Sequence, residues 1–226
     1  MNLRTPLAAY VVPFVIFMLG LMLVSTVKSM AGASESLLLQ RPEFWVYPLQ
    51  SLACAIALIF YWKKYDFGRG GWGWAIGGGL LALILWVSPQ VFFGLPERTG
   101  GFDPTVFEND PMLYGLTVLA RFFRLVIVVP LVEEIFWRGF LMRYLIREDF
   151  QSLPFGTYKP SAFFGVAFLF MLVHSMPDWP AAFLTGVIFN FVAVRTRSLA
   201  ACIAAHALTN LILGVYIMST RQWGFW

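Results

Sequence analysis

Apolar residues fill seven stretches of the chain, and polar residues gather in the segments between them. The stretches cover residues 6–27, 44–62, 72–93, 125–145, 161–174, 181–194 and 199–218. A helix needs about 20 mainly apolar residues to cross the hydrocarbon core of a bilayer. The pattern therefore predicts an all-α fold, a polytopic bundle of about seven transmembrane helices.

Two features leave the number of spans open. The fifth and sixth stretches are short, so we expect these helices to tilt, to lie half buried under neighbours or to extend at their ends. Residues 112–119 are also apolar, but Arg121 and Arg124 follow directly. This segment is an interfacial helix, an extension of the fourth span or an eighth span. No soluble domain is evident, so residues 1–226 are expected to form a single integral-membrane domain.

The composition excludes a soluble protein. Of the 226 residues 59% are hydrophobic, and the mean hydropathy is +0.73. Charged residues make up 12%, which is about half the share of roughly 25% found in soluble domains. The net charge of +4 is small and lies mostly in loops, so it indicates orientation in a lipid bilayer and no binding to nucleic acid. Cys54 and Cys202 lie in apolar stretches and are expected to pack as small core residues.

Basic residues follow the second, fourth and sixth stretches, whereas the alternate loops are neutral or acidic. Residues 94–111 hold four acidic side chains against Arg98, and residues 175–180 hold Asp178. Lys28 and Arg41 are exceptions to this alternation. Because loops rich in Lys and Arg stay in the cytoplasm, we expect a cytoplasmic N-terminus and an extracytoplasmic C-terminus. The expected location is the plasma (inner) membrane.

Two adjacent glutamates, Glu133 and Glu134, interrupt the fourth stretch, and Arg138 follows them. A carboxylate inside a bilayer has to be paired, protonated or held in a polar cavity, so it usually serves a function. On a helix Glu134 and Arg138 share a face, whereas Glu133 points about 100° away from Glu134. We therefore expect an ion pair between Glu134 and Arg138, with Glu133 free to act as a base. Pro130 is expected to kink the helix and to open room for water. The alternative is a paired charge cluster that only joins helices.

The only two histidines of the chain also lie in or beside apolar stretches. His174 is four residues after Phe170, so the phenyl ring could wall a cavity that the imidazole enters. Alternatively, His174 is a polar residue at the membrane interface. His206 and Asn210 share a helix face, and together they could donate two hydrogen bonds to an oxyanion. Such side chains also form hydrogen bonds between membrane helices, so both interpretations stay open.

The ordered set Glu-Glu-x-x-x-Arg, Phe-x-x-x-His and His-x-x-x-Asn within apolar helices resembles the CPBP family, the CAAX proteases and bacteriocin-processing enzymes, also called the Abi family. The resemblance covers residues 126–214, and no motif position is missing. The chain is similar to the Ras-converting enzymes, which remove the last three residues of prenylated CAAX proteins. The resemblance implies a glutamate-dependent intramembrane endopeptidase with a helical fold and a cavity open to the cytosol. The motif-bearing protease core is expected over residues 112–218.

The seven motif residues receive expected roles. The catalytic set is Glu133, Glu134, His174, His206 and Asn210, and the supporting set is Arg138 and Phe170. Glu133, oriented with His174, is expected to activate a water molecule that attacks a peptide carbonyl of a membrane-associated protein or peptide. His206 and Asn210 are expected to hold the oxyanion, while the ion pair sets the geometry.

Two other functions remain open. Two histidines and a glutamate are a known ligand set of catalytic zinc, but the motif His-Glu-x-x-His is absent, so we expect no metal and no cofactor. The second alternative is a non-catalytic immunity or scaffold protein on the same fold. A transporter would usually show internal repeats, and none is evident in the sequence.

Overall fold

The structure is a computed structural model that describes residues 5–32 and 34–226, and its regular elements in these ranges are all helical. The longer helices are α1 (Pro6–Ala31), α3 (Glu43–Tyr61), α4 (Trp72–Phe93), α5 (Pro111–Phe123), α8 (Pro160–Leu172), α9 (Trp179–Thr196) and α10 (Leu199–Thr220). The shorter ones are α2 (Leu37–Gln40), α6 (Val129–Glu134) and α7 (Met142–Tyr144). The predicted all-α fold is confirmed.

Within the described residues, six helices are long and apolar enough to cross a membrane. They are Pro6–Ala31, Glu43–Lys64, Trp72–Phe93, Pro111–Tyr144, Met176–Thr196 and Leu199–Thr220. The helix α8 is apolar but shorter, so the seven predicted stretches correspond to six long helices and a short one. Residues 112–119 form no separate span, because α5 continues directly into the fourth span. Many large apolar side chains of α3 and α4 are exposed, which suits contact with lipid.

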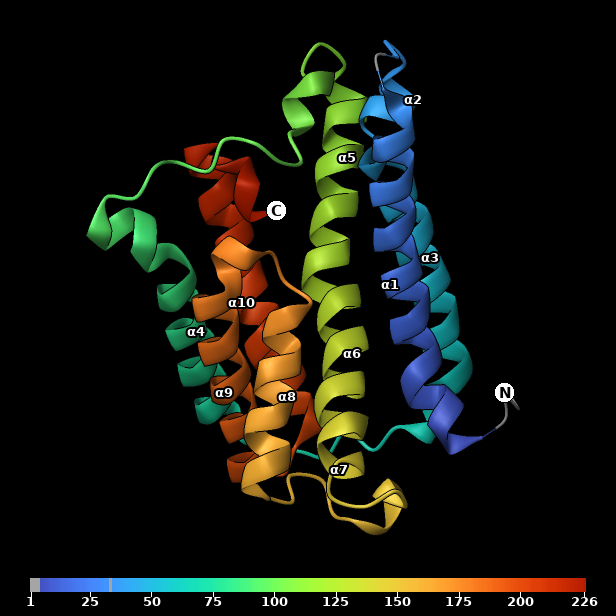
Figure 1. Ribbon diagram of the computed structural model, residues 1–226, viewed down its shortest axis with the longest axis vertical. Helices are drawn as coiled ribbons and strands as arrows, with labels where there is room; N and C mark the ends of the chain where they lie inside the picture. The colour runs from blue at the N-terminus through green and yellow to red at the C-terminus, as the bar shows by residue number, and fades with distance from the viewer. Residues whose placement is uncertain (1–4, 33) are drawn as a thin grey trace.

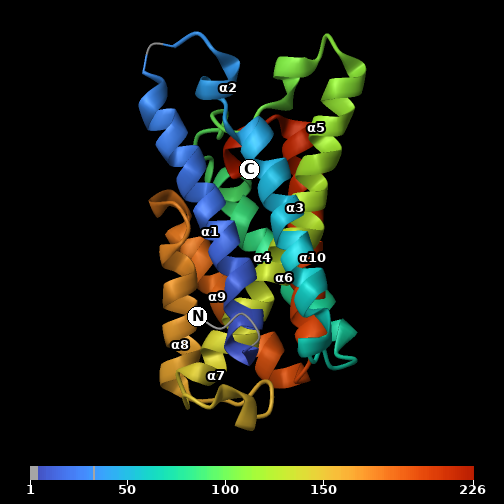
Figure 2. The ribbon, with the colours of Figure 1, turned by 90° about the vertical axis from the view of Figure 1, so that its right-hand side faces the viewer.

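A central helix of 34 residues, Pro111–Tyr144, runs along the molecule between two groups of helices (Figure 1). On one side α1 and α3 pack against each other. On the other side α8 packs against α9, and α4 packs against α9 and α10 (Figure 2). The start of α1 lies near one end of the bundle and the C-terminus lies near the other (Figure 1). This arrangement agrees with a polytopic helical bundle.

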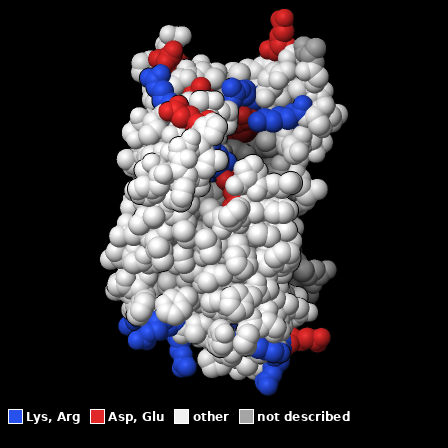
Figure 3. Space-filling model, turned by 60° about the vertical axis from the view of Figure 1, so that its left-hand side comes forward, with Lys and Arg blue, Asp and Glu red and all other residues white. Residues whose placement is uncertain are grey.

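The two ends of the molecule differ in charge. The end with the loops after α3, α7 and α9, which we call the basic end, carries eight Lys or Arg against three Asp or Glu in the described part of the chain. The opposite end, which we call the acidic end, carries four basic against seven acidic residues. Figure 3 shows basic atoms along the lower edge and both signs of charge near the top. The middle of this face shows no charged residues, as expected of a surface in contact with lipid.

The central helix is α-helical at its start and changes register further along. Asp110 accepts a hydrogen bond from the backbone of Leu113 at 3.0 Å, and Pro111 occupies the first turn. Two π-helical turns, η3 (Arg124–Val128) and η4 (Ile135–Leu141), lie on either side of α6. Such turns form bonds five residues apart and are frequent at functional sites. Both glutamates of the motif therefore lie between two changes of helical register.

Pro130 explains where the first π-turn ends. The N–H of Val129 donates to the carbonyl of Arg124, five residues back. The next bond in this register would join residue 130 to the carbonyl of Leu125, but proline has no N–H. Asn210 Nδ2 donates to the Leu125 oxygen instead, at 2.9 Å. Pro130 thus changes the hydrogen-bond register of the helix. It also leaves the carbonyl of Leu125 free to accept a hydrogen bond from α10.

Two glycines let helices of the site approach at backbone distance. A Cβ atom at Gly79 would lie 2.7 Å from the carbonyl oxygen of Ala205, which joins α4 closely to α10. Thr209 Oγ1 donates to the carbonyl of Gly79 at 2.9 Å across the same contact. A Cβ atom at Gly186 would lie 2.9 Å from Ala167 Cα, between α9 and α8. Small residues at such contacts are typical of membrane helix packing.

Candidate active site

Glu134 and Arg138 form an ion pair in the interior of the bundle. Arg138 Nη1 lies 3.0 Å from Glu134 Oε1, and both side chains are fully buried. The predicted pairing of these two residues is therefore confirmed. A buried ion pair is tolerated only when further hydrogen bonds satisfy its remaining donors and acceptors, so the surroundings of Arg138 matter as much as its partner.

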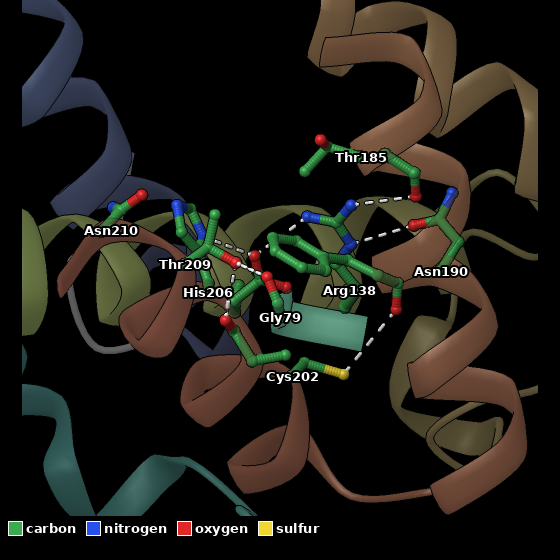
Figure 4. A network of polar contacts seen from close by, with 12 residues as sticks. Gly79, Arg138, Thr185, Asn190, Cys202, His206, Thr209 and Asn210 are labelled. Atoms are coloured by element: carbon green, nitrogen blue, oxygen red, sulfur yellow. Dashed lines mark hydrogen bonds and ion pairs between the residues drawn. The ribbon is translucent and has the colours of Figure 1, made fainter. Parts of the chain in front are cut away.

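Arg138 joins three helices. Its Nε donates to Asn190 Oδ1 at 2.9 Å, and its Nη2 donates to the carbonyl of Gly186 at 3.2 Å, both on α9 (Figure 4). Asn190 Nδ2 in turn donates to the carbonyl of Phe163 on α8 at 2.7 Å. Asn190 was not predicted as part of the site, although an amide in the middle of an apolar stretch is itself a signal of a buried polar contact. The guanidinium thus fixes Glu134 relative to α8 and α9.

His206 shares the carboxylate of Glu134. Its Nδ1 lies 2.8 Å from Glu134 Oε1, and its ring packs against Phe189 with the centroids 5.3 Å apart. An oxygen that already accepts from Arg138 acts as an acceptor, so His206 Nδ1 carries the hydrogen. The ring of His206 also lines a cavity. The free nitrogen Nε2 then accepts a hydrogen bond in the neutral ring and donates one in the imidazolium.

Glu133 differs from its neighbour in having no such partners. Its side chain lines the cavity and the residue is 7% exposed. Its Oε2 has no hydrogen-bond partner among the described residues. Arg124 interacts with Glu133 electrostatically but forms no salt bridge with it in the described structure. A buried carboxylate oxygen without a partner is costly, so Glu133 is in place to bind water or a ligand.

His174 follows the last turn of α8. Its Nδ1 lies 2.7 Å from the carbonyl of Phe170, which can only accept, so Nδ1 donates and Nε2 is free. The imidazole lies between Phe170 and Trp86, with centroids 4.7 and 5.7 Å away. Trp179 Nε1 donates to the His174 carbonyl at 3.1 Å and secures the end of the helix. The ring of Phe170 lies 5.0 Å from Arg138 Cζ and separates it from the cavity.

Five of the seven motif residues line one cavity with a volume of about 290 Å³. They are Glu133, Phe170, His174, His206 and Asn210. The other two, Glu134 and Arg138, lie behind its wall and contact it through His206 and Phe170. The sequence analysis expected these residues to come together from three separate stretches, and the structure places them around one space. Their catalytic roles remain predictions.

The first half of the chain also contributes to the cavity, although no motif was recognised there. The helix α1 supplies an apolar wall that includes Phe14 and Phe17, and α4 supplies Trp86. Arg121 and Arg124, noted in the sequence only as the end of an apolar segment, line the cavity as well. Two arginines inside a spanning helix are an available signal of a polar interior, because arginine is costly in lipid.

The cavity extends from Glu133 toward the acidic end, where Phe225 and Trp226 line it. Figure 3 shows a hollow in the upper half of the molecule, with basic and acidic atoms inside it. The distribution of basic loops predicts that this end is extracytoplasmic, whereas the family resemblance implies a cavity open to the cytosol. These two expectations are incompatible in this structure, and a labelling experiment has to decide between them.

A zinc site has few ligands available. In residues 5–32 and 34–226, no three His, Cys, Asp or Glu side chains form a group that could hold a metal ion. His206 Nδ1 is bonded to Glu134 and His174 Nδ1 to a backbone carbonyl, which leaves the two Nε2 atoms. Catalytic zinc usually has three protein ligands and an open position. That the protein works without a metal nevertheless stays a prediction.

Comparison with known proteins identifies the region around the cavity. Residues 115–212 match the protein family described as type II CAAX prenyl endopeptidase Rce1-like. No match was found among the curated proteins or among the solved structures. The matched range contains all seven motif residues and both arginines of the cavity wall. Residues 115–212, which carry the cavity and its motif residues, are thus similar to the Rce1-like type II CAAX prenyl endopeptidases.

Proposed function

We propose that the protein is an intramembrane endopeptidase that hydrolyses a peptide bond of a membrane-associated protein or peptide, with Glu133 as the general base. The observation that carries this proposal is the contrast between two adjacent glutamates. Glu134 Oε1 is held by Arg138 and His206, whereas Glu133 forms no salt bridge among the described residues and its side chain lines the cavity; Oε2 has no partner in either residue. A carboxylate without a fixed partner can accept a proton from water, while one shared between two donors serves to position them.

In the proposed reaction a water molecule lies between Glu133 and the carbonyl carbon of the scissile peptide bond. Glu133 takes a proton as the water oxygen attacks, and the same proton passes to the leaving nitrogen when the C–N bond breaks. His174 orients the water through its free Nε2. General base catalysis by a positioned side chain contributes about 10²–10⁴-fold to the rate.

The oxyanion of the tetrahedral intermediate is held by His206 and Asn210. His206 donates through Nε2 in the imidazolium form, with its Nδ1 2.8 Å from Glu134 Oε1. Asn210 uses an N–H of Nδ2 for the carbonyl of Leu125, and the amide has a second N–H for a ligand. Losing a single oxyanion donor typically lowers kcat by about 10²–10³.

The substrate reaches this site from within or beside the bilayer, since the cavity lies among spanning helices. The partners are therefore the lipid bilayer and a membrane-associated protein or peptide. We infer residence in the plasma (inner) membrane, with the basic end in the cytoplasm, from the charges of the loops. No cofactor is required in this scheme, because the buried carboxylate of Glu133 activates the water. In a zinc peptidase the metal ion contributes to that activation.

The test compares cells that carry Glu133→Gln with cells that carry the unchanged protein. Mass spectrometry of the membrane fraction should find a protein that keeps a peptide segment in the variant and loses it in the parent. The purified parent should cleave that protein, and purified Glu133→Gln should cleave it at least about 100-fold more slowly. Glu148→Gln is a matched control, because Glu148 is exposed in a loop at the basic end.

Equal cleavage by Glu133→Gln and the parent would show that the base is misassigned. Loss of activity with a chelator and its return with stoichiometric zinc would favour the zinc alternative. A protein that processes nothing in either strain, yet loses its cellular role when His206 or Asn210 is changed, would favour the scaffold alternative.

A further inference from the structure

Two buried arginines line the same cavity as Glu133, nearer to the acidic end. Arg121 is 4% exposed and Arg124 is 6% exposed. In the described part of the chain neither forms a salt bridge with a carboxylate. Arginine is almost never fully buried without a partner. We call these two residues the arginine pair, and their environment indicates what the missing partner is.

Arg121 has donors that nothing satisfies. Its Nε and Nη1 are buried and have no hydrogen-bond partner among the described residues. Its guanidinium lies against the rings of Phe102, Tyr47 and Trp226, with Cζ 4.7, 5.2 and 5.5 Å from the centroids. Aromatic rings attract and hold a cation, but they do not replace strong hydrogen-bond acceptors. The cation is thus fixed in place, while the N–H groups of Nε and Nη1 still need an acceptor.

Arg124 is oriented by the neighbouring helix α3. Its Nε donates to Gln50 Oε1 at 3.0 Å, and Gln50 Nε2 donates to the carbonyl of Phe17. The ring of Tyr47 lies 4.2 Å from Arg124 Cζ. Its two terminal nitrogens make no hydrogen bond to the described residues. A guanidinium with its plane fixed and its outer edge free is suited to bidentate binding of a carboxylate.

The fixed charges nearby leave an excess of positive charge. Glu43 is the carboxylate that interacts with Arg121 electrostatically, but its oxygens lie 3.0 Å from Lys28 Nζ and 3.7 Å from Arg41 Nη1. One carboxylate therefore faces three cations at this end of α3. The carboxylate that interacts with Arg124 electrostatically is Glu133, which lines the same cavity and forms no salt bridge with it in the described structure. An anion that enters the cavity would restore the balance.

We propose that the arginine pair binds the free C-terminal carboxylate of the peptide substrate, an inference that rests on the proposed peptidase function. Arg124 and Arg121 precede Glu133 by nine and twelve residues. Their side chains are therefore about 13 and 18 Å from it along the helix. An extended peptide covers about 3.3–3.6 Å per residue. The enzyme would thus release a C-terminal tail of about four or five residues.

A peptide terminus fits the cavity better than a lipid headgroup does. The cavity continues from the arginine pair to Glu133, and most of its wall is aromatic or aliphatic. An extended apolar tail with a single charge at its end matches this distribution of polar and apolar surface. A lipid phosphate at the arginine pair would need no continuation toward Glu133, so its binding would be independent of the catalytic end.

Binding can be measured without cleavage. The probe is a fluorescein-labelled hexapeptide of alanine and leucine, made with a free C-terminal carboxylate and, separately, with a C-terminal amide. Fluorescence anisotropy reports its binding to Glu133→Gln protein in nanodiscs of phosphatidylcholine. We expect the acid to bind at least about tenfold more tightly than the amide, since charge-assisted hydrogen bonds are lost in the amide. Adding Arg121→Met or Arg124→Met should abolish this preference, while Arg121→Lys should keep part of it.

The control is Arg147→Met, which removes an exposed arginine at the basic end and should leave the preference unchanged. Thermal melting checks that each variant is folded, and Arg124→Met serves if Arg121→Met does not fold. Equal binding of acid and amide, or no binding of either, would overturn the inference. So would loss of the preference in nanodiscs that contain phosphatidylglycerol, because a lipid phosphate would then occupy the site.

The same peptides separate this inference from the proposed function. If the unchanged protein cleaves neither peptide but Glu133→Gln protein binds the acid more tightly than the amide, the result contradicts the peptidase proposal and supports the carboxylate site. If the unchanged protein cleaves acid and amide at equal rates, the peptidase proposal stands and the carboxylate site is wrong.

Discussion

Glu134→Gln should destabilise the protein by about 3–5 kcal/mol, whereas Glu133→Gln should change its stability by less than about 1 kcal/mol. The substitution at Glu134 removes a charge that lies 3.0 Å from Arg138 Nη1 and 2.8 Å from His206 Nδ1. The amide oxygen can still accept a hydrogen bond, but the fully buried guanidinium of Arg138 loses its counter-charge. The Glu133 side chain forms no salt bridge or hydrogen bond with the described residues, so the substitution there breaks none.

Thermal unfolding in detergent, followed by the fluorescence of the nine tryptophans, measures this difference. For a protein of this size the loss should lower the melting temperature of Glu134→Gln by about 6–20 °C. The double variant Glu134→Gln/Arg138→Met should lose less than the sum of the single losses, because it leaves no unpaired charge. Equal melting temperatures for the variants at positions 133 and 134 would refute the assignment of separate roles.

Three further predictions concern the orientation in the membrane, the Asn210 contact and the need for a metal. In a background without Cys54 and Cys202, an impermeant thiol reagent added outside intact cells should label a cysteine at position 100 and not one that replaces Lys63; the reverse would put the acidic end in the cytoplasm. Asn210→Leu should leave the carbonyl of Leu125 without its donor, and so lower the stability by about 1–3 kcal/mol in a melting experiment. The same variant should slow cleavage by about 10²-fold, because it removes an oxyanion donor. An unchanged melting temperature would contradict the observed contact. Chelator-treated protein should keep its activity, measured beside elemental analysis, and recovery only after adding zinc would disprove metal independence.

The sequence predicted features that depend on residues close together along the chain. The apolar stretches predicted the helices, and the spacing of four residues predicted that Glu134 and Arg138 share a face. The same spacing predicted that Phe170 and His174 belong together, and the two are indeed in contact. In each case helix geometry alone is sufficient, so no knowledge of tertiary packing is needed.

Contacts between distant helices were not predictable in this way. Asn190 accepts from Arg138 across 52 positions, and nothing in its local pattern identifies that partner. Gln50 orients Arg124 across 74 positions, so the role of α3 in the cavity was missed. The direction of the cavity also depends on how all the helices pack. For that reason the sequence alone does not show at which charged end of the bundle the cavity opens.

The first π-turn of the central helix has a consequence for how the protein tolerates change. A π-turn holds one residue more than an α-turn, so η3 absorbs an extra residue while the helix on either side keeps its orientation. Deleting a single residue between Arg124 and Val128 would therefore restore the α-helical repeat and leave the arginine pair and Glu133 facing the same cavity. Inserting a further residue there would instead rotate the two halves of the helix by about 100° relative to each other and turn the arginine pair away from the cavity. The central helix thus tolerates the loss of a residue at this turn, whereas the gain of one uncouples the two ends of the site.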